Sequence, residues 1–434
     1  MKKVALHNLG CKVNAYETEA MQQILEERGY EIVPFDVGAD VYVINTCTVT
    51  NMADRKSRQM LHKAKKMNPN AIVVAAGCYV QAAQEALKLD DAVDIIIGNN
   101  MKQNLADILE AYEEAHKEEE KEYHVLDINH TKEYETLSIE KTAEHTRAYI
   151  KVQDGCNQFC SYCIIPFARG RVRSRSMEDV KAEVCQLAQA GYREVVLTGI
   201  HLSSYGIDKE DGNGLLELIE MVHEIDGIER IRLGSLEPRI ITEEFVKKIS
   251  SLKKMCPHFH LSLQSGCDAT LQRMNRRYSA EEYYEKCVLL RKYFDEPALT
   301  TDVIVGFPGE TEEEFAETKA FLEKIAFFET HIFKYSRRKG TKADRMENQI
   351  PEEIKTQRSH VLLALHEQNQ KAYIQKIIGK NVEILFEEEV QQGEEKCFVG
   401  HTKEYIRVCM PSGGEDWSNK ISHCILKESD VQCT

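Results

Sequence analysis

Short apolar runs separated by segments with helical spacing characterise the chain up to about residue 112. The runs are rich in β-branched residues and predict strands at Val4–Leu9, Val41–Asn45 and Ile72–Ala76. Between the first two, Glu17–Arg28 carries apolar residues at helical spacing, and Gly29 is a typical helix stop. This alternation predicts an α/β domain over residues 1–112 with an open parallel sheet.

A second alternating region spans residues 145–371, after an acidic stretch over 113–144 that we interpret as a solvated linker. Its apolar runs predict six strands, at Ala148–Gln153, Glu194–Thr198, Arg230–Gly234, His258–Leu263, Leu299–Val305 and Thr330–Tyr335. Six strand–helix units indicate an incomplete, TIM-like (β/α)6 barrel. The chemistry of such a barrel is expected at the carboxyl ends of its strands.

The last segment, residues 374–434, has a different pattern of short apolar runs split by glycine and polar turns. The runs predict strands at Val382–Phe386, Lys396–Val399, Tyr405–Met410 and Ile421–Leu426. A small all-β domain of the nucleic-acid-binding kind fits this pattern. Its seven Lys and Arg against eleven Asp and Glu leave open whether it contacts RNA, with Lys403, Tyr405 and Arg407 as candidate contacts.

Composition narrows the class of protein. The 434 residues suit several domains, and no apolar run approaches the ~20 residues of a membrane helix, so no membrane association is expected. The net charge of −15 argues against a protein that coats nucleic acid non-specifically. Fourteen cysteines without an export signal indicate a reducing, cytoplasmic location, where thiols serve metals or catalysis more often than disulfides.

Three cysteines stand close together directly after a predicted strand. Cys156, Cys160 and Cys163 form a Cys-x₃-Cys-x₂-Cys array. Because a protein-saturated [4Fe–4S] cluster takes four cysteines, three leave one iron open to a chelating cofactor such as S-adenosylmethionine. A zinc knuckle lacking its fourth ligand is the alternative, but the next cysteine is Cys185, too far along the chain for zinc-like spacing.

Three further cysteines, Cys11, Cys47 and Cys78, each follow a predicted parallel strand. The carboxyl ends of such strands converge at one sheet edge, so these thiols are expected to hold a second cluster with an open iron. The alternative is that they are buried core cysteines. We interpret the other eight as structural: Cys185, Cys256, Cys267, Cys287, Cys397, Cys409, Cys424 and Cys433.

The first array, with Tyr162 before its last cysteine, resembles the signature of the radical S-adenosylmethionine superfamily. The resemblance implies that this cluster reduces the sulfonium and releases a 5′-deoxyadenosyl radical. It also implies cofactor-binding roles for residues at later strand ends, each of which has a packing or turn role as its alternative. These residues are Gly199, Ser235, Glu237, Gln264, Ser265 and Asp302.

Across nearly its whole length the chain resembles the methylthiotransferase family, whose final β module is the TRAM domain. The resemblance implies that one S-adenosylmethionine donates a methyl group, a second makes the radical, and the N-terminal cluster carries the sulfur. It also implies a tRNA substrate modified at adenosine 37 of the anticodon loop. A small electron donor such as a flavodoxin or ferredoxin is expected.

Three substrates compete within that family: threonylcarbamoyladenosine, isopentenyladenosine and a ribosomal-protein aspartate. Several segments resemble the threonylcarbamoyladenosine branch: Gly10-Cys11-Lys12-Val13-Asn14, Asn45-Thr46-Cys47-Thr48-Val49-Thr50, the run from Ala168 to Arg175, and the run from Leu261 to Asp268. That branch converts the base to its 2-methylthio derivative. A non-catalytic iron–sulfur electron carrier is a remote alternative, disfavoured by the barrel.

A threonylcarbamoyl group carries a carboxylate, so its pocket is expected to offer a cation. Arg169, Arg171, Arg173 and Arg175 alternate along the chain, and an extended backbone would aim all four to one side. We expect some of them to bind tRNA phosphates and one to bind the substrate carboxylate; a solvated edge strand is the alternative. Arg337, in a basic cluster after the sixth barrel strand, is expected to extend the phosphate track, with solvated loop charge as its alternative.

Overall fold

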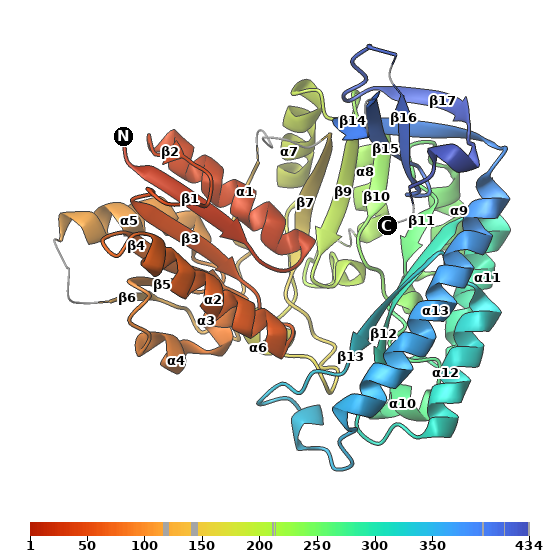
Figure 1. Ribbon diagram of the computed structural model, residues 1–434, viewed down its shortest axis with the longest axis horizontal. Helices are drawn as coiled ribbons and strands as arrows, with labels where there is room; N and C mark the ends of the chain where they lie inside the picture. Colours follow the sequence, from red (N-terminus) through yellow and green to blue (C-terminus); the bar gives the residue numbers. More distant parts are fainter. Residues whose placement is uncertain are drawn as a thin grey trace.

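The computed structural model describes residues 1–434 apart from 116–120, 140–145, 211, 213, 393–394, 412 and 433–434. Cys433 therefore lies outside the described residues, as do parts of the acidic stretch. An N-terminal α/β region lies beside a barrel-like region, and a small β domain sits at one end of the barrel (Figure 1). Among the described residues, no helix combines the length and apolarity needed to cross a membrane.

The first region is built on a six-stranded parallel sheet in the order β2-β1-β3-β4-β5-β6. Its strands are β1 (Lys3–Asn8), β2 (Glu31–Ile32), β3 (Val41–Thr46), β4 (Ile72–Gly77), β5 (Ile95–Ile97) and β6 (Glu122–His124). Its helices are α1 (Lys12–Glu27), α2 (Asn51–Met67), α3 (Cys78–Ala82), α4 (Gln84–Lys88) and α5 (Leu105–Glu114). Apolar faces of α1 and α5 cover one side of the sheet, and those of α2 and α3 cover the other. The predicted open parallel sheet is confirmed.

The linker expected over 113–144 needs a correction. Residues Glu122–His124 form β6, which pairs with β5 and extends the first sheet. This strand is only three residues long and lies among charged residues, so it forms no apolar run that would predict a strand.

The barrel region contains the six expected parallel strands in two sheets, of order β10-β9-β7-β8 and β11-β12-β13. These are β7 (Arg147–Asp154), β9 (Glu194–Gly199), β10 (Arg230–Leu233), β11 (His258–His260), β12 (Ala298–Val305) and β13 (Glu329–Lys334), with the short antiparallel β8 (Arg173–Ser174) at the edge. Parallel bridges from Ile231 to Met255 and from Leu236 to Leu261 join the two sheets. The result is an incomplete barrel.

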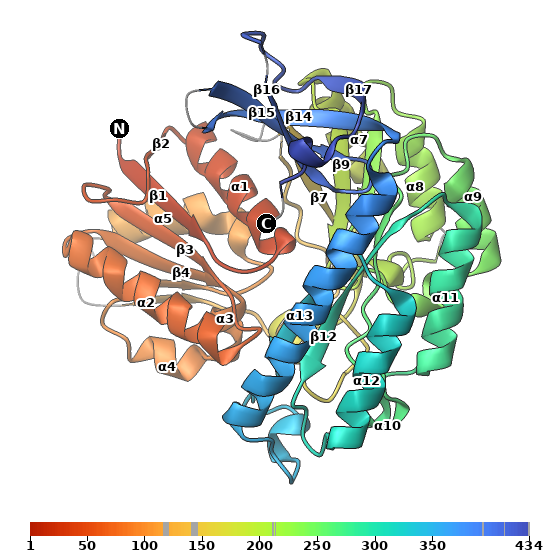
Figure 2. The same cartoon turned by 45° about the vertical axis from the view of Figure 1, so that its right-hand side comes forward.

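Helices cover the outer face of this barrel and leave its inner face toward the first region (Figure 2). They are α7 (Met177–Gln189), α8 (Leu215–His223), α9 (Glu243–Ser251), α10 (Asp268–Arg273), α11 (Ala280–Tyr293), α12 (Glu312–Ile325) and α13 (Glu352–Ile377). The short helix α6 (Ile165–Ala168) instead packs against α3 of the first region. Helix α12 follows the Gly-Phe-Pro-Gly turn at 306–309. At its start the Thr311 side chain accepts from the Glu314 backbone N–H, and the Glu314 side chain accepts from the Thr311 backbone N–H.

The strands alternate sharply between an apolar outer face and a polar inner face. Ile231, Phe259 and Val303 belong to the core shared with the covering helices. Their neighbours along each strand therefore face the barrel lumen. These lumen residues include Tyr149, Lys151, Glu194, Arg232, His258, His260, Asp302 and His331.

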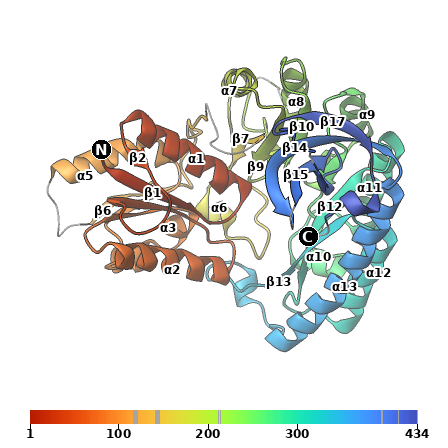
Figure 3. The same cartoon turned by 45° about the horizontal axis from the view of Figure 1, so that its top comes forward.

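The C-terminal domain is an antiparallel sheet in the order β16-β15-β14-β17. Its strands are β14 (Asn381–Gln392), β15 (Glu395–Thr402), β16 (Arg407–Pro411) and β17 (Ile421–Ile425). The domain sits over the amino-terminal ends of the barrel strands (Figure 3). There Arg230 donates to a Glu383 carboxylate oxygen at 2.8 Å, and Arg147 to Glu387 at 2.7 Å.

Tyr405 of this domain packs against the amino-terminal end of the barrel, which we call the barrel floor. Its ring stacks on His401, with centroids 4.5 Å apart, and the Arg147 and Arg232 guanidinium groups lie 4.9 and 4.6 Å from its centroid. Tyr405, a candidate RNA contact, therefore also packs against the barrel, and its role in RNA binding stays a prediction. A tyrosine in an otherwise polar loop offers no local signal that it packs against a neighbouring domain.

Glu194 holds this floor together, since it is fully buried and pairs with Arg147, Arg230 and Arg232. Although burial opposes its charge, Arg232 and Arg147 hold the pKa of Glu194 well below its usual value. A lowered folded-state pKa gives stability that is present above the unfolded pKa of about 4.3 and is lost as the pH falls through the folded value.

Glu194→Gln is therefore expected to destabilise the protein by about 1.5–3 kcal/mol at neutral pH, because charge-assisted hydrogen bonds become neutral ones. The difference between the thermal midpoints of wild type and variant, measured from pH 7 downward, should begin to shrink as the pH falls below about 4 and should keep shrinking at lower pH. A difference that stays constant across this range would show that the charge of Glu194 is not the stabilising feature.

Candidate active site between two cysteine triads

The loop after β7 carries the first triad, Cys156, Cys160 and Cys163. It begins at Gly155, whose φ is +71° and whose added Cβ would lie 1.8 Å from the Arg171 carbonyl oxygen, so only glycine fits. Burial, together with the neighbouring Cys160 and Cys156 thiols, raises the pKa of Cys163 to about 12. The three thiols are thus close enough to interact. The structure brings this predicted triad together.

Arg276 reaches this triad from the loop after α10. Its Nη1 donates to Cys160 Sγ at 3.3 Å, and its Nε donates to the Tyr278 hydroxyl at 2.8 Å. The backbone N–H of Gln158 donates to Cys156 Sγ at 3.5 Å. These donors suit sulfurs that are deprotonated when they bind iron. Sequence reasoning missed Arg276, because more than a hundred residues separate it from the thiol.

The second triad lies at the carboxyl ends of three adjacent strands, as predicted. Cys11 follows β1, Cys47 follows β3, and Cys78 follows β4. Burial raises the pKa of Cys47 to about 11, with added contributions from the Cys78 and Cys11 thiols. Cys47 and Cys78 are buried, whereas Cys11 keeps exposed surface.

Two glycines make room for these sulfurs. Gly10 has a φ of +109°, and a Cβ there would lie 2.9 Å from Cys47 Sγ. Gly77 has a φ of +96°, and a Cβ there would lie 2.5 Å from the Asn45 side-chain oxygen. Both backbones thus adopt conformations that favour glycine and allow the cysteines to approach closely. Three soft donors in such a cradle fit an iron–sulfur cluster with one open site.

Arg169 connects the two triads. It follows the first triad by six residues, yet its Nε donates to Cys78 Sγ of the second at 3.1 Å. Its Nη1 and Nη2 donate to the two Glu17 carboxylate oxygens at 2.7 and 2.9 Å, and Nη2 also donates to Asn14. Although burial opposes its charge, Cys78 and Glu17 hold the pKa of Arg169 well above its usual value.

Buried charges around Arg169 favour an anionic group. Lys102 and Lys151 each donate to Glu17 at 2.7 Å, and Lys151 also pairs with Asp154 at 2.7 Å. Three buried cations thus share two buried carboxylates, and Arg173 adds a fourth cation 3.6 Å from Asp154. Thiolates bound to a cluster would offset this positive excess. The second triad therefore fits an iron–sulfur centre electrostatically as well as sterically.

The expectation that the four alternating arginines all point to one side is wrong. Arg169, Arg173 and Arg175 are buried; Arg175 pairs with Glu183 and donates to the Tyr16 hydroxyl at 3.2 Å. Only Arg171 is exposed, with its guanidinium 4.5 Å from the Phe159 ring centroid. The extended strand assumed for this segment has only the two residues of β8, and acidic residues from distant helices draw the other side chains inward.

Arg337 is exposed and donates to Asp344 at 2.6 Å, so its phosphate-binding role stays a prediction. The next residue, Arg338, instead crosses to the first region, where it donates to the Thr48 hydroxyl at 2.7 Å and pairs with Asp54 at 2.8 Å. The loop after β13 therefore helps to fix the two regions against each other.

The residues expected to hold S-adenosylmethionine lie at barrel strand ends, and their roles stay predictions. Glu237 accepts from Arg239 Nε at 2.8 Å, and Gln264, with a φ of +75°, donates its N–H to the Asp302 carbonyl. Ser235 is exposed after β10, Ser265 is buried and bonded to Thr318, and the Tyr162 ring meets Phe307 edge-on with centroids 6.3 Å apart. At Gly199 an added Cβ would lie 2.8 Å from the Gln153 side-chain oxygen, which is a packing constraint.

The buried His201 Nε2 at this end of the barrel lacks a hydrogen-bond partner among the described residues, whereas His260 Nε2 lies 3.3 Å from an Asp302 carboxylate oxygen. Burial, Arg276 and Arg239 lower the pKa of His201 to about 4, so this ring is neutral at physiological pH. Ligand atoms of His260, Asp302 and His331 also lie within 4.8 Å of one another. Unsatisfied buried polar atoms are costly, and a polar cofactor or substrate in the lumen would satisfy them.

Comparisons with known proteins agree with this arrangement. Residues 3–98 match the model of the uncharacterized protein family UPF0004, and residues 150–322 match that of the radical SAM superfamily. The chain is 43% identical to the threonylcarbamoyladenosine tRNA methylthiotransferase MtaB of Bacillus subtilis, over 97% of this chain and 93% of the relative. It is 45% identical to the protein of that name from Aquifex aeolicus, over 89% and 93%.

A tRNA-2-methylthio-N(6)-dimethylallyladenosine synthase from Acetivibrio thermocellus is 36% identical over 93% of this chain and 84% of the relative. Among solved structures, the radical S-adenosylmethionine methyltransferase TsrM from Kitasatospora setae aligns with a TM-score of 0.58 at 16% identity. That alignment covers 78% of this chain and 73% of TsrM. At this identity the likeness supports the fold alone.

Proposed function

Because this chain belongs to the methylthiotransferase family of radical S-adenosylmethionine enzymes, we propose that it converts threonylcarbamoyladenosine 37 of tRNA to its 2-methylthio derivative. The observation that carries this proposal is the pair of cysteine triads at adjoining strand ends, joined by Arg169. When bound, two [4Fe–4S] clusters and S-adenosylmethionine supply the one-electron chemistry, the sulfur and the methyl group.

The protein's own residues would bind and orient these groups. Cys156, Cys160 and Cys163 would hold the radical-generating cluster, with Arg276 donating to one sulfur. Cys11, Cys47 and Cys78 would hold the sulfur-carrying cluster, with Arg169 donating to Cys78. The polar lumen between them would receive the adenosine and exclude bulk water from the reacting centre.

The alternative substrate, isopentenyladenosine, is supported by relatives named for the dimethylallyl derivative. The polarity of the lumen favours threonylcarbamoyladenosine instead. His260, Asp302 and His331 face the lumen with polar atoms that an apolar prenyl group could not bind. A substituent with carboxylate, hydroxyl and amide groups offers these residues partners.

Two further features complete the proposal. A small electron donor, such as a flavodoxin or ferredoxin, would reduce the radical-generating cluster. The half-buried Cys160 and Cys163, followed closely in the chain by the exposed Phe167, support a docking surface near this cluster. A cytoplasmic location follows from a tRNA substrate and from the many unpaired thiols.

The substrate assignment predicts a clear selectivity. Reconstituted enzyme given S-adenosylmethionine, a reductant and tRNA bearing either threonylcarbamoyladenosine or isopentenyladenosine should methylthiolate only the former. Mass spectrometry of the digested nucleosides reports both products. Equal turnover of the two tRNAs, or turnover of the isopentenyl form alone, would reject the assignment.

A further inference from the structure

Lys12 is a cation placed directly beside the second triad. It is the first residue of α1 and follows Cys11, so about 3.8 Å separates the two Cα atoms. Its side chain is exposed, and its Nζ lies 5.9 Å from the Tyr149 ring centroid on the inner face of β7. With the residues that the structure describes, Lys12 forms neither a hydrogen bond nor an ion pair.

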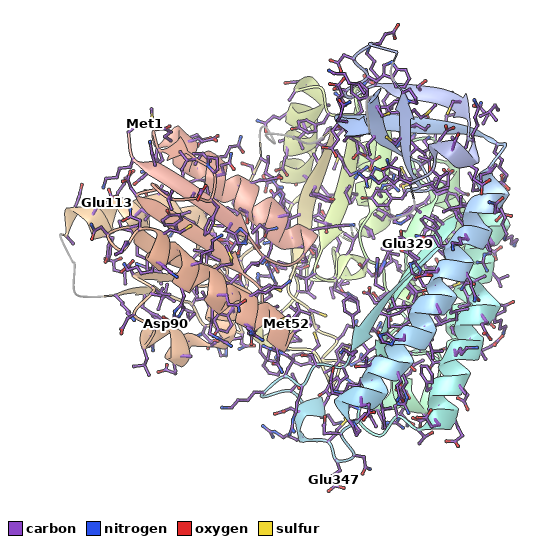
Figure 4. The ribbon with its side chains drawn as sticks, viewed as in Figure 1. Met1, Met52, Asp90, Glu113, Glu329 and Glu347 are labelled. Carbon is purple, nitrogen blue, oxygen red and sulfur yellow. The ribbon has the colours of Figure 1, made fainter. Side chains whose placement is uncertain are left out.

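The Lys12 ammonium group points from the N-terminal region into the barrel lumen. It interacts electrostatically with Arg147, Arg232 and Glu194 of the floor and with Glu329 and His331 of β13. Figure 4 labels Glu329 at the start of β13, next to α13. The side chain therefore occupies the space between the second triad and the polar strands.

The other cations that border this space are already paired. Arg147 and Arg232 bind Glu194, and Arg230 binds Glu383. Lys151 binds Glu17 and Asp154. Among the described lumen residues, this leaves Lys12 as the cation without an anionic partner, in a place where a substrate can reach it.

We infer that Lys12 binds the carboxylate of the threonylcarbamoyl group and so selects the substrate. The inference rests on the proposed function, which brings C2 of the base to the sulfur-carrying triad. The N6 substituent of the same ring then lies within the span of a flexible lysine next to Cys11. A charge-assisted hydrogen bond in this sheltered lumen would favour the anionic substituent over a neutral one.

The test pairs a protein substitution with a substrate substitution. Wild-type holoenzyme and Lys12→Gln are compared on anticodon stem-loop RNA bearing threonylcarbamoyladenosine and on the same RNA with the carboxylate as its methyl ester. We expect wild type to bind the acid about 10- to 100-fold more tightly than the ester. Lys12→Gln should bind the acid and the ester with equal affinity, as measured by fluorescence anisotropy and by KM. The substitution should change kcat less than it changes KM.

Three controls separate this role from others. Lys12→Arg keeps the charge and should retain most of the preference, whereas Lys66→Gln, at an exposed lysine of α2, should leave it unchanged. Iron and sulfide content of Lys12→Gln should equal that of wild type, which shows that Cys11 still binds its cluster.

An equal loss of affinity for acid and ester in Lys12→Gln would overturn the inference, since it would indicate a phosphate contact or a structural role. An undiminished preference for the acid would overturn it too. Failure of wild type to methylthiolate threonylcarbamoyladenosine tRNA would instead overturn the proposed function, so the two failures are distinguishable.

Discussion

Cys47→Ala is expected to abolish methylthio transfer while S-adenosylmethionine cleavage to 5′-deoxyadenosine continues. Cys47 is the central ligand of the second triad, and the first triad lies on a separate loop after β7. Loss of one of three thiolates should release the second cluster and leave the first bound. Chromatography of 5′-deoxyadenosine and of the methylthio nucleoside in the same reaction measures both activities.

Cys160→Ala provides the complementary result, because it removes a ligand of the first triad. Both products should then disappear. Cys185→Ala is a matched control, since this half-buried cysteine packs against the barrel core away from both triads. Methylthio product formed by Cys47→Ala at the wild-type rate would contradict the assignment of the second triad.

Arg169→Met is expected to destabilise the junction between the two regions by about 3–5 kcal/mol, the range for removing one partner of a buried ion pair. The variant leaves Glu17 and Asp154 with fewer partners and removes the donor to Cys78 Sγ. A lower thermal midpoint and faster loss of iron to a chelator are the expected readouts.

Arg171→Met is the natural control, because it is two residues away and exposed beside Phe159. Arg169→Lys separates charge from geometry: it keeps a cation but lacks the fork that contacts Glu17, Asn14 and Cys78 together. We expect an intermediate midpoint and an altered electron paramagnetic resonance signal of the reduced second cluster. If Arg169→Met and Arg171→Met both had the thermal midpoint and the rate of iron loss of wild type, the junction would not depend on the Arg169 side chain.

The sequence was sufficient to predict the features that depend on strand order. Cys11, Cys47 and Cys78 each follow an apolar run, and parallel strands necessarily end at one edge, so their convergence followed from local pattern alone. The cysteine array after β7 lies within one short stretch of the chain, so it too could be recognised from the sequence. The strands β2, β5 and β6 were missed, because two or three residues carry too little periodicity to be recognised.

Side-chain pairing between distant segments was beyond such reasoning. Glu17 looks like an ordinary residue of an amphipathic helix, yet it is the buried partner of Arg169, Lys102 and Lys151. No local pattern marks Glu17 or Glu183 as the acids that draw arginines away from the surface. The position of the C-terminal domain was equally hidden, since it depends on Arg147 and Arg230 reaching across to Glu387 and Glu383.

The content of iron and acid-labile sulfide after anaerobic reconstitution tests most directly whether each triad holds its own cluster. With two [4Fe–4S] clusters, wild type should contain about eight iron and eight sulfide per chain, and Cys47→Ala and Cys160→Ala should each contain about four. Wild type that binds only about four iron, with Cys47→Ala unchanged from it, would contradict the two-cluster account.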